Sequence, residues 1–323
     1  MEREPQTLIE VIRFFSDPKV CFDYMLRLRW PDGIVRCPTC DRDDPRFLAN
    51  EQRWECRARH PRKKFSLKTN TIFEDSPIKL DKWLTAMWLL VNAKNGISSM
   101  EIHRSIGVTQ KTAWFMLQRL RLAMQTGTFM KLGGTVEVDE TFIGGKARNM
   151  HKEQRQAKIH GRGGVGKAIV MGLLERHGKV SVAVVPDRSS ASLQPRVRAI
   201  VKGGAELMTD ALPSYKGLDA EYVHGVIDHA EAYVDGKVHT NGIENFWALL
   251  KRMIGGTYVS VEPYHLFRYL DEESFRFNER EATDARRFQK AMAGVTGKRL
   301  THKKLTGKLG LDQPGKAGAS VLA

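Results

Sequence analysis

The apolar residues of this chain change their spacing at Gly133-Gly134, and this change constrains the fold more than any other sequence feature. Before it, over residues 80–124, apolar residues recur every three or four positions, as on one face of a helix. After it, residues 135–139 alternate apolar and polar, as in a half-buried strand. The 323 residues are enough for two domains with separate cores. We therefore expect a helical N-terminal part followed by a sheet domain.

The expected sheet domain continues well beyond residue 139. Strands are predicted at 168–174 and 180–185, joined as a hairpin by the turn at 176–179. The remaining elements follow in chain order: a helix near 191–201, a strand at 206–209, a helix beyond Pro213, a short strand near 222–227, and helices at 241–254 and 263–279. The order β-β-β-α-β-α-β-α predicts a mixed α/β sheet that opens with an antiparallel hairpin. An RNase H-like sheet has this plan, and other α+β folds are alternatives.

Within the helical part, two consecutive helices have clear end signals. Ser98 followed by Glu101 is typical of a helix N-terminus, Gly107 ends that helix, and Thr109 caps the next. A short helix, a tight turn and a second capped helix predict a helix-turn-helix. Its groove-reading end would carry Gln110, Lys111 and Thr112. An ordinary helical hairpin is the alternative.

All four cysteines lie in the first fifth of the chain. Cys37 and Cys40 are separated by two residues, and His60 follows Cys56 by four. This spacing predicts a closed, structural Zn²⁺ site in a small β-ribbon. A polar segment of about 40 residues lacks another source of stability, which favours zinc over packing of Cys56 as a small hydrophobe with an exposed His60. Cys21 lies on an apolar helical face and is expected in the core.

The chain is strongly basic, with 52 Lys and Arg against 37 Asp and Glu and a formal net charge of +15. Such an excess favours nucleic-acid binding, by a DNA-binding protein or by a ribosomal or RNA-modifying factor. No apolar run approaches the roughly 20 residues of a membrane span, and the acidic, polar start is not typical of a signal peptide. We expect a soluble, cytoplasmic protein with no membrane partner.

Two further segments are basic. Residues 161–167 match most of a phosphate-binding P-loop, but Ala168 offers no hydroxyl for magnesium and the segment precedes a strand rather than a helix. We interpret it as a basic loop that contacts DNA phosphates and not as a nucleotide site. Residues beyond about 285 are basic and poor in apolar residues, so a solvated tail is expected there.

Three acidic residues stand where a metal-dependent active site needs them. Asp139 ends the first predicted strand of the sheet domain, Asp210 ends another, and Glu244 lies on the helix that follows. Ligands gather where the strands of such sheets finish, and paired carboxylates hold the Mg²⁺ or Mn²⁺ ions of phosphodiester chemistry. Lys251 lies two helical turns after Glu244, so it would project from the same face and bind a phosphate.

Each of these acids alone has a structural alternative, because an Asp at a strand end is often a turn former or a helix cap. Glu140, Asp187 and Asp235 compete on that footing, and Asn241 is a candidate for capping a helix. The joint placement of the chosen three on the right elements favours them over these competitors.

Taken together, the motifs resemble those of bacterial insertion-sequence transposases that have an N-terminal zinc ribbon and a DDE-type, RNase H-like catalytic domain. The resemblance spans roughly residues 15–280 and is carried by Cys-Pro-Thr-Cys (37–40), residues 65–77, Val-Asp-Glu-Thr-Phe-Ile-Gly-Gly (138–145), Thr209-Asp210, and His-Thr-Asn-Gly-Ile-Glu-Asn-Phe-Trp (239–247) with Leu-Leu-Lys-Arg (249–252). It implies that Asp139 and Asp210 are the first two catalytic acids. Relatives also use Asn as the third ligand, so Asn241 and Asn245 are candidates beside Glu244.

The resemblance implies metal-dependent cleavage at the ends of an insertion sequence, followed by attack of the freed 3′-hydroxyl on target DNA. The expected partners are double-stranded DNA and, because two ends must be brought together, further copies of the chain. The expected domains are an N-terminal helical segment with the zinc ribbon (1–78), a helix-turn-helix segment (79–130), an RNase H-like domain (131–282) and a basic tail (283–323). The alternatives are a zinc-ribbon DNA-binding regulator with an inactive nuclease fold, and an RNase H-type nuclease without strand transfer.

Overall fold

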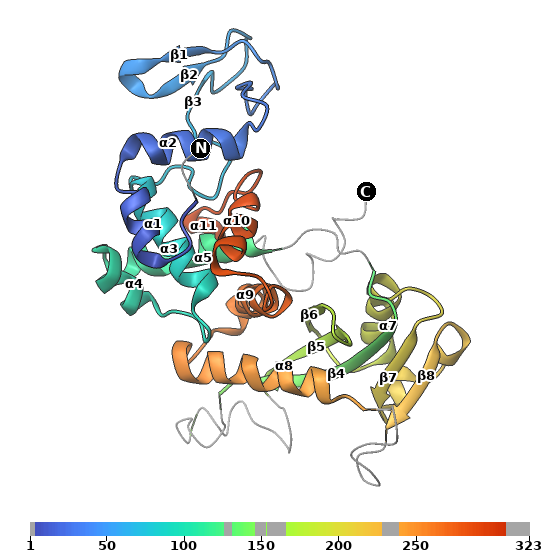
Figure 1. Ribbon diagram of the computed structural model, residues 1–323. Helices are drawn as coiled ribbons and strands as arrows, with labels where there is room; N and C mark the ends of the chain where they lie inside the picture. Colours follow the sequence, from blue (N-terminus) through green and yellow to red (C-terminus); the bar gives the residue numbers. More distant parts are fainter. Residues whose placement is uncertain (1–3, 126–130, 146–152, 154–165, 228–238, 308–323) are drawn as a thin grey trace. The chain divides into compact units, whose positions relative to one another are not determined.

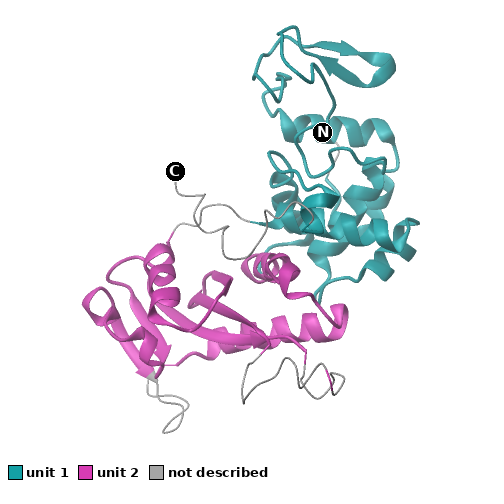
Figure 2. Ribbon diagram, turned by 180° about the vertical axis from the view of Figure 1, so that it is seen from behind, with its two compact units in different colours: residues 1–125, 281–310 teal, residues 126–280, 311–323 magenta. Residues whose placement is uncertain are grey.

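The chain divides into two compact units (Figures 1 and 2). The computed structural model describes residues 4–125, 131–145, 153, 166–227 and 239–307. Unit 1 comprises residues 1–125 and 281–310, and unit 2 comprises residues 126–280 and 311–323. Most of the predicted basic loop at 161–167 lies outside the described residues, as does Asp235.

Unit 1 is a helical assembly that carries a small three-stranded sheet. Its helices are α1 (Leu8–Phe14), α2 (Pro18–Arg29), α3 (Leu80–Asn92), α4 (Ser99–Ile106), α5 (Gln110–Met124), α10 (Asp284–Ala293) and α11 (His302–Leu305). The almost fully apolar α3 lies at the centre and packs against α1, α2, α4, α5 and α10. Ser98 and Glu101 form the predicted capping box of α4, and Gly107 ends that helix in the left-handed conformation. The predicted helix pair is therefore present as α4 and α5.

The small sheet of unit 1 is an antiparallel ribbon. It consists of β1 (Arg46–Leu48), β2 (Arg53–Glu55) and β3 (Lys64–Phe65), with the short 3₁₀ helix η1 (Ala49–Glu51) between the first two strands. Trp54 of β2 forms its core: the ring stacks on Phe65 and Phe22 and meets Trp30 edge-on. Because Phe22 belongs to α2, this aromatic cluster joins the ribbon to the helices of unit 1.

The expectation of a solvated tail from residue 283 is wrong for the segment that contains α10 and α11. One face of α10 is apolar and buried, with Ala285, Phe288 and Met292 at helical spacing. Burial of a Phe side chain contributes roughly 1.5–3 kcal/mol, and the charged residues of α10 lie outside the buried face, so packing that face does not remove them from water. After α10, Thr296 forms a β-bridge with Thr71. The segment that follows unit 2 in sequence, residues 281–310, thus returns to complete unit 1.

Unit 2 contains a mixed five-stranded sheet with the predicted antiparallel opening. Its strands are β4 (Thr135–Ile143), β5 (Ala168–Glu175), β6 (Val180–Val185), β7 (Glu206–Asp210) and β8 (Val223–Ile227). They lie in the order β6-β5-β4-β7-β8; β5 is antiparallel to both β6 and β4, and β7 is parallel to both β4 and β8. This order confirms the mixed α/β fold and its RNase H-like plan.

Helices cover both faces of the sheet. They are α7 (Ser190–Ile200), α8 (Asn241–Arg252) and α9 (Leu266–Asn278). Val136 and Val138 of β4 pack in one core with α7, whereas Ile143 packs in a second core with α8 and α9. Since alternate residues of a strand face opposite sides, the odd-numbered residues of β4 face α8.

Two of the predicted helices differ from expectation. The helix predicted beyond Pro213 is replaced by two 3₁₀ turns, η3 (Pro213–Tyr215) and η4 (Leu218–Ala220), because Gly217 between them takes a positive φ of 91°. The helix predicted over 241–254 ends at Arg252, and its last two predicted residues begin a π-helical segment, η5 (Met253–Tyr258). A separate 3₁₀ turn, η6 (Pro263–His265), comes before α9. Among the described residues, no helix has the length and apolar character needed to cross a membrane.

Candidate active site and metal centre

The two predicted aspartates lie side by side at the end of the parallel strand pair. Val138 of β4 pairs with Thr209 of β7, so the next residues, Asp139 and Asp210, lie at the same level. Residues paired in parallel strands point to the same face, which here is the face covered by α8. Asp210 is the last residue of β7. Two neighbouring strands therefore bring one carboxylate each to the position where the parallel pairing of β4 and β7 ends.

Helix α8 fixes the position of Asp139. The indole Nε1 of Trp247 donates a hydrogen bond of 2.9 Å to Asp139 Oδ2. Gly172, which pairs with Asp139 across β4 and β5, makes room for this ring, because a Cβ atom there would come within 2.7 Å of it. In the sequence, Trp247 was noted only as the last residue of the motif at 239–247; its spacing of three from Glu244 was the available signal that it faces the acids.

Glu244 lies in the first turn of α8 and completes the acidic group. Its side chain is exposed, and Thr240 Oγ1 donates to it over 3.4 Å. Burial raises the pKa of Asp139, and the charges of Asp210 and Glu244 raise it further, whereas the Trp247 hydrogen bond lowers it. The charges of Asp210 and Glu244 therefore reach Asp139, and ionising Asp139 in this buried position is unfavourable without a cation nearby.

Oxygen ligands in such a set fit a hard divalent cation. Carboxylates are preferred by Mg²⁺ and Mn²⁺, and a divalent charge would offset the repulsion that raises the pKa of Asp139. The remaining predicted site residues lie on the same helix. Asn241 is its first residue, one turn before Glu244, and Lys251 is two turns after it; both side chains are exposed.

Two of the competing acids, Glu140 and Asp187, have structural partners. Glu140 is buried; it accepts hydrogen bonds from the Tyr215 hydroxyl and, at 3.0 Å, from Nε of Arg188. A second nitrogen of Arg188 lies 3.8 Å from Asp210 Oδ2. Asp187 accepts from the backbone N–H of Ser189 just before α7. These bonds give Glu140 and Asp187 roles in holding the loops around the acidic group.

A buried acid that the sequence analysis did not single out anchors the start of α8. Glu137 accepts from the backbone N–H of Ile243 at 2.9 Å and from Nε of Arg176 at 2.8 Å. A carboxylate at a helix N-terminus is stabilised by the free N–H groups there. Gly242 allows this approach, since a Cβ on it would lie 2.8 Å from a Glu137 oxygen. Glu137 thereby fixes the helix that carries Glu244 and Trp247.

The predicted zinc ligands form one cluster in unit 1. The ligand atoms of Cys37, Cys40, Cys56 and His60 all lie within 4.8 Å of one another. The Sγ atoms of Cys40 and Cys56 are 3.6 Å apart, and Cys37 Sγ lies 3.5 Å from His60 Nε2. Tetrahedral Zn–S bonds of about 2.3 Å place two sulfur atoms about 3.8 Å apart. The cluster therefore fits the geometry of a zinc ribbon.

Local hydrogen bonds prepare these ligands for a metal. His60 Nδ1 lies 2.6 Å from the Pro61 carbonyl, which only accepts, so Nδ1 carries the proton and Nε2 is left for coordination. Burial raises the pKa of Cys37, but hydrogen bonds from the backbone of Thr39 and Cys40 outweigh it and the pKa falls to about 7. Cys21 is different: it is buried outside the cluster and its thiol donates to the Phe15 carbonyl, as expected of a core residue.

Comparison with known proteins gives matches to both units. Residues 131–278 match the family described as ISXO2-like transposase domain, and residues 16–58 match the transposase zinc-ribbon domain. An uncharacterized transposase-like protein of Haemophilus influenzae is 36% identical over 104 residues, which cover 32% of this chain and 84% of that protein. An uncharacterized protein in transposable element ISH50 of Halobacterium salinarum is 25% identical over 290 residues, covering 84% of this chain and 96% of that protein.

Proposed function

Since the chain belongs to the ISXO2-like transposases, with an N-terminal zinc ribbon and a DDE transposase domain, we propose that it cleaves DNA at the ends of an insertion sequence and joins the freed 3′-hydroxyl groups to target DNA. One observation carries the proposal. Asp139 of β4 and Asp210 at the end of β7 directly follow the last residue pair of these two parallel strands, and the charge of Glu244 raises the pKa of Asp139. We assign these three residues as the metal ligands of the catalytic unit, with Asn241 as the alternative third ligand.

Each catalytic residue has a distinct task in this proposal. Bound Mg²⁺ or Mn²⁺ would activate the attacking oxygen and stabilise the leaving oxygen of the phosphodiester. Trp247 holds one oxygen of Asp139, and the backbone N–H of Leu212 holds Asp210 Oδ1 at 3.2 Å, so both carboxylates keep their orientation. Lys251, exposed on the same helix, binds a phosphate of the DNA.

DNA recognition is assigned to residues 1–130 and catalysis to residues 131–282. The Cys37 cluster holds a structural Zn²⁺ that stabilises the ribbon, and α4 and α5 act as a helix-turn-helix. The surplus of positive charge, +15 over the chain, supports binding of duplex DNA. Two element ends must meet for joining, so the active assembly contains more than one copy of the chain.

A strand-transfer assay tests this function. Full-length protein, Mg²⁺ and labelled element-end DNA are incubated with a target plasmid, and nicked and joined products are separated. We expect both nicks at the element terminus and covalent joining. Cleavage without joining would replace the proposal with a nuclease, and binding without cleavage would replace it with a regulator.

A Trp247→Phe substitution should shift the pH dependence of cleavage. The indole N–H stabilises the ionised form of Asp139, so its loss should raise the pKa of Asp139 and move the acid limb of the pH–rate profile to higher pH. Loss of a hydrogen bond to a charged group should slow cleavage at neutral pH about tenfold. Trp83→Phe is the matched control, since its indole bonds Ser76 in unit 1. An unshifted profile would remove Trp247 from the site.

A further inference from the structure

A groove of about 630 Å³ in unit 1 is lined by residues from three separate parts of the chain. Arg53 and Lys64 come from strands β2 and β3, and Arg62 from the turn before β3. Arg299 comes from the segment between α10 and α11. We call this hollow the cationic groove. It exists only because the C-terminal segment folds back onto unit 1, where the Val295 carbonyl accepts from the backbone N–H of Ile72 at 3.0 Å.

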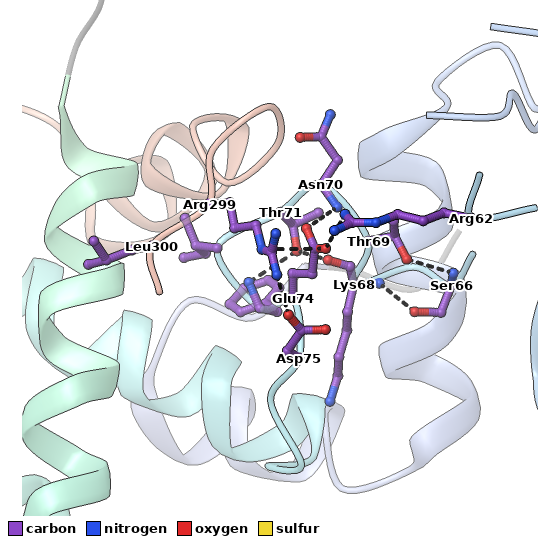
Figure 3. A network of polar contacts seen from close by, with 12 residues as sticks. Arg62, Ser66, Lys68, Thr69, Asn70, Thr71, Glu74, Asp75, Arg299 and Leu300 are labelled. Atoms are coloured by element: carbon purple, nitrogen blue, oxygen red, sulfur yellow. Dashed lines mark hydrogen bonds and ion pairs between the residues drawn. The ribbon is translucent and has the colours of Figure 1, made fainter. Parts of the chain in front are cut away.

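Two arginines in the cationic groove share one carboxylate. Arg62 and Arg299 approach Glu74 from opposite sides (Figure 3), with nitrogens 3.6 Å and 3.4 Å from Glu74 Oε1. The other oxygen of Glu74 accepts from the backbone N–H of Asn70 at 2.9 Å. One carboxylate neutralises one charge, and each guanidinium has five N–H groups. Arg299 also forms an ion pair with Asp75. The two carboxylates hold both guanidinium groups in place and leave N–H groups of Arg62 and Arg299 available to an anion.

The charges around the cationic groove do not balance. Its cations are Arg53, Arg62, Lys64, Lys68 and Arg299, and its acids are Glu74 and Asp75. Glu51 forms an ion pair of 2.8 Å with Lys64, so five cations face three acids and the surplus is two positive charges. The Lys68 ammonium is already bonded to the Ser76 and Ile78 carbonyls. The side chains of Arg62 and Lys64 are 67% and 46% exposed, so they reach solvent. A concave surface with this surplus attracts an anionic ligand.

The cationic groove adjoins a second hollow of about 660 Å³ at the start of α5. Both hollows include Asp75 and Ser76 in their walls. The second is lined by Lys111 and Thr112, at the predicted groove-reading end of α5, and by aromatic rings that include Trp114. An anion in the cationic groove would thus lie beside the helix expected to read DNA bases. A polyanion fits such a continuous track better than a single small anion does.

We propose that the cationic groove binds the phosphate backbone of duplex DNA, with Arg62 and Arg299 as the principal phosphate contacts. This inference rests on the proposed function and adds to it a site that the helix-turn-helix alone does not supply. It also gives the C-terminal segment a part in DNA binding, because Arg299 follows the catalytic unit in sequence. Contacts to phosphates position a protein on DNA without reading its sequence, so the groove should act equally on all duplexes.

Salt-dependent DNA binding tests the proposal. Full-length wild type, Arg62→Ala, Arg299→Ala and the double variant are titrated against a fluorescent mixed-sequence duplex at several KCl concentrations. Each lost phosphate contact should lower the slope of log affinity against log salt by about 0.9 and weaken binding roughly three- to tenfold. Arg198→Ala is the matched control, since Arg198 is 42% exposed on α7 of unit 2 and ion-paired with Glu221. It should keep the wild-type slope.

A measurement on the wild type covers the case in which a variant fails to fold. Acetylation footprinting should show that duplex DNA protects Lys64 of the groove, whereas exposed Lys202 of unit 2 stays reactive. A wild-type slope in the double variant, equal loss in Arg198→Ala, or an unprotected Lys64 would overturn the groove as a phosphate site. Failure of the wild type to bind any duplex would instead overturn the proposed function, so the two failures are distinguishable.

Discussion

An Asp210→Asn substitution is expected to reduce cleavage and joining of element-end DNA by on the order of 10³-fold or more. The amide keeps the size of the side chain and the hydrogen bond that Asp210 Oδ1 accepts from Leu212, so the fold should be retained. What is lost is the negative charge needed to hold a divalent cation beside Asp139. Asp139→Asn should have an effect of the same size, measured as initial rates in the strand-transfer assay.

Asp187→Asn is the matched control for this prediction. Asp187 is a nearby exposed acid whose Oδ1 accepts from the Ser189 backbone N–H, and an Asn side chain keeps this acceptor, so both stability and rate should stay near normal. Comparing Glu244→Gln with Asn241→Ala then identifies the third ligand, since only the true ligand should cause the large loss. Joined product at a wild-type rate from Asp210→Asn would contradict the proposed mechanism.

Thermal melting separates metal binding from chemistry in the same variants. Burial and its acidic neighbours raise the pKa of Asp139, so ionised Asp139 destabilises the metal-free protein as pH rises through that pKa. A bound divalent ion should offset this by roughly 1.4 kcal/mol at ten times its dissociation constant. Mg²⁺ should therefore raise the melting temperature of the wild type by a few degrees and leave that of Asp139→Asn unchanged.

The positions of the two aspartates along their strands depend on local pattern and were predictable in part. The strand ending at Asp210 was predicted, whereas β4 was expected to end at Asp139 and continues to Ile143, because its pairing with β5 extends four residues further. Adjacent parallel strands then bring the two residues to the same level. The Trp247 bond to Asp139 could not be predicted in this way. It depends on α8 crossing β5 at Gly172, which leaves space for the Trp247 ring. Gly172 and Trp247 are 75 positions apart in the chain, so only the tertiary structure brings them together.

The prediction for the C-terminal segment was wrong where α10 forms and packs. Its many charges predicted a solvated tail, because composition averages over both faces of a helix. Phe288 and Met292 lie four residues apart on one face of α10, and that face alone decides whether the helix packs. The buried ion pair of Glu272 and Arg276 on α9 could not be predicted for a related reason. A count of charged residues does not distinguish a pair buried inside unit 2 from two charges in solvent.

Removal of the zinc site should have the largest effect on stability. Cys56→Ala, or treatment with a strong chelator, is expected to unfold the ribbon, since structural zinc sites contribute apparent binding energies on the order of 10 kcal/mol. Cys56 is buried, and its Sγ accepts from the Ala58 backbone N–H in addition to facing Cys40. We expect zinc content to fall from about one ion per chain to none, together with loss of DNA binding.

Tryptophan signals report how far the unfolding spreads. Trp54 of β2 packs on Phe65 of β3 and on Phe22 of α2. Loss of the metal should therefore reduce the near-ultraviolet circular dichroism of these rings and expose strands β2 and β3 to proteolysis. The sheet of unit 2 has its own cores and should keep its melting transition.

Cys21→Ala is the matched control for the zinc prediction. Burial, and then the charge of Asp81, raises the pKa of Cys21 to about 12, so this thiol stays protonated and should not bind metal. The variant should lose about 1 kcal/mol of stability from a smaller core side chain and retain its zinc. If Cys21→Ala lost zinc, or if Cys56→Ala kept both zinc and a folded ribbon, the ligand assignment would be wrong. Retention of zinc by a His60→Ala variant would limit the site to the three cysteines, because His60 Nε2 supplies the fourth position in the cluster.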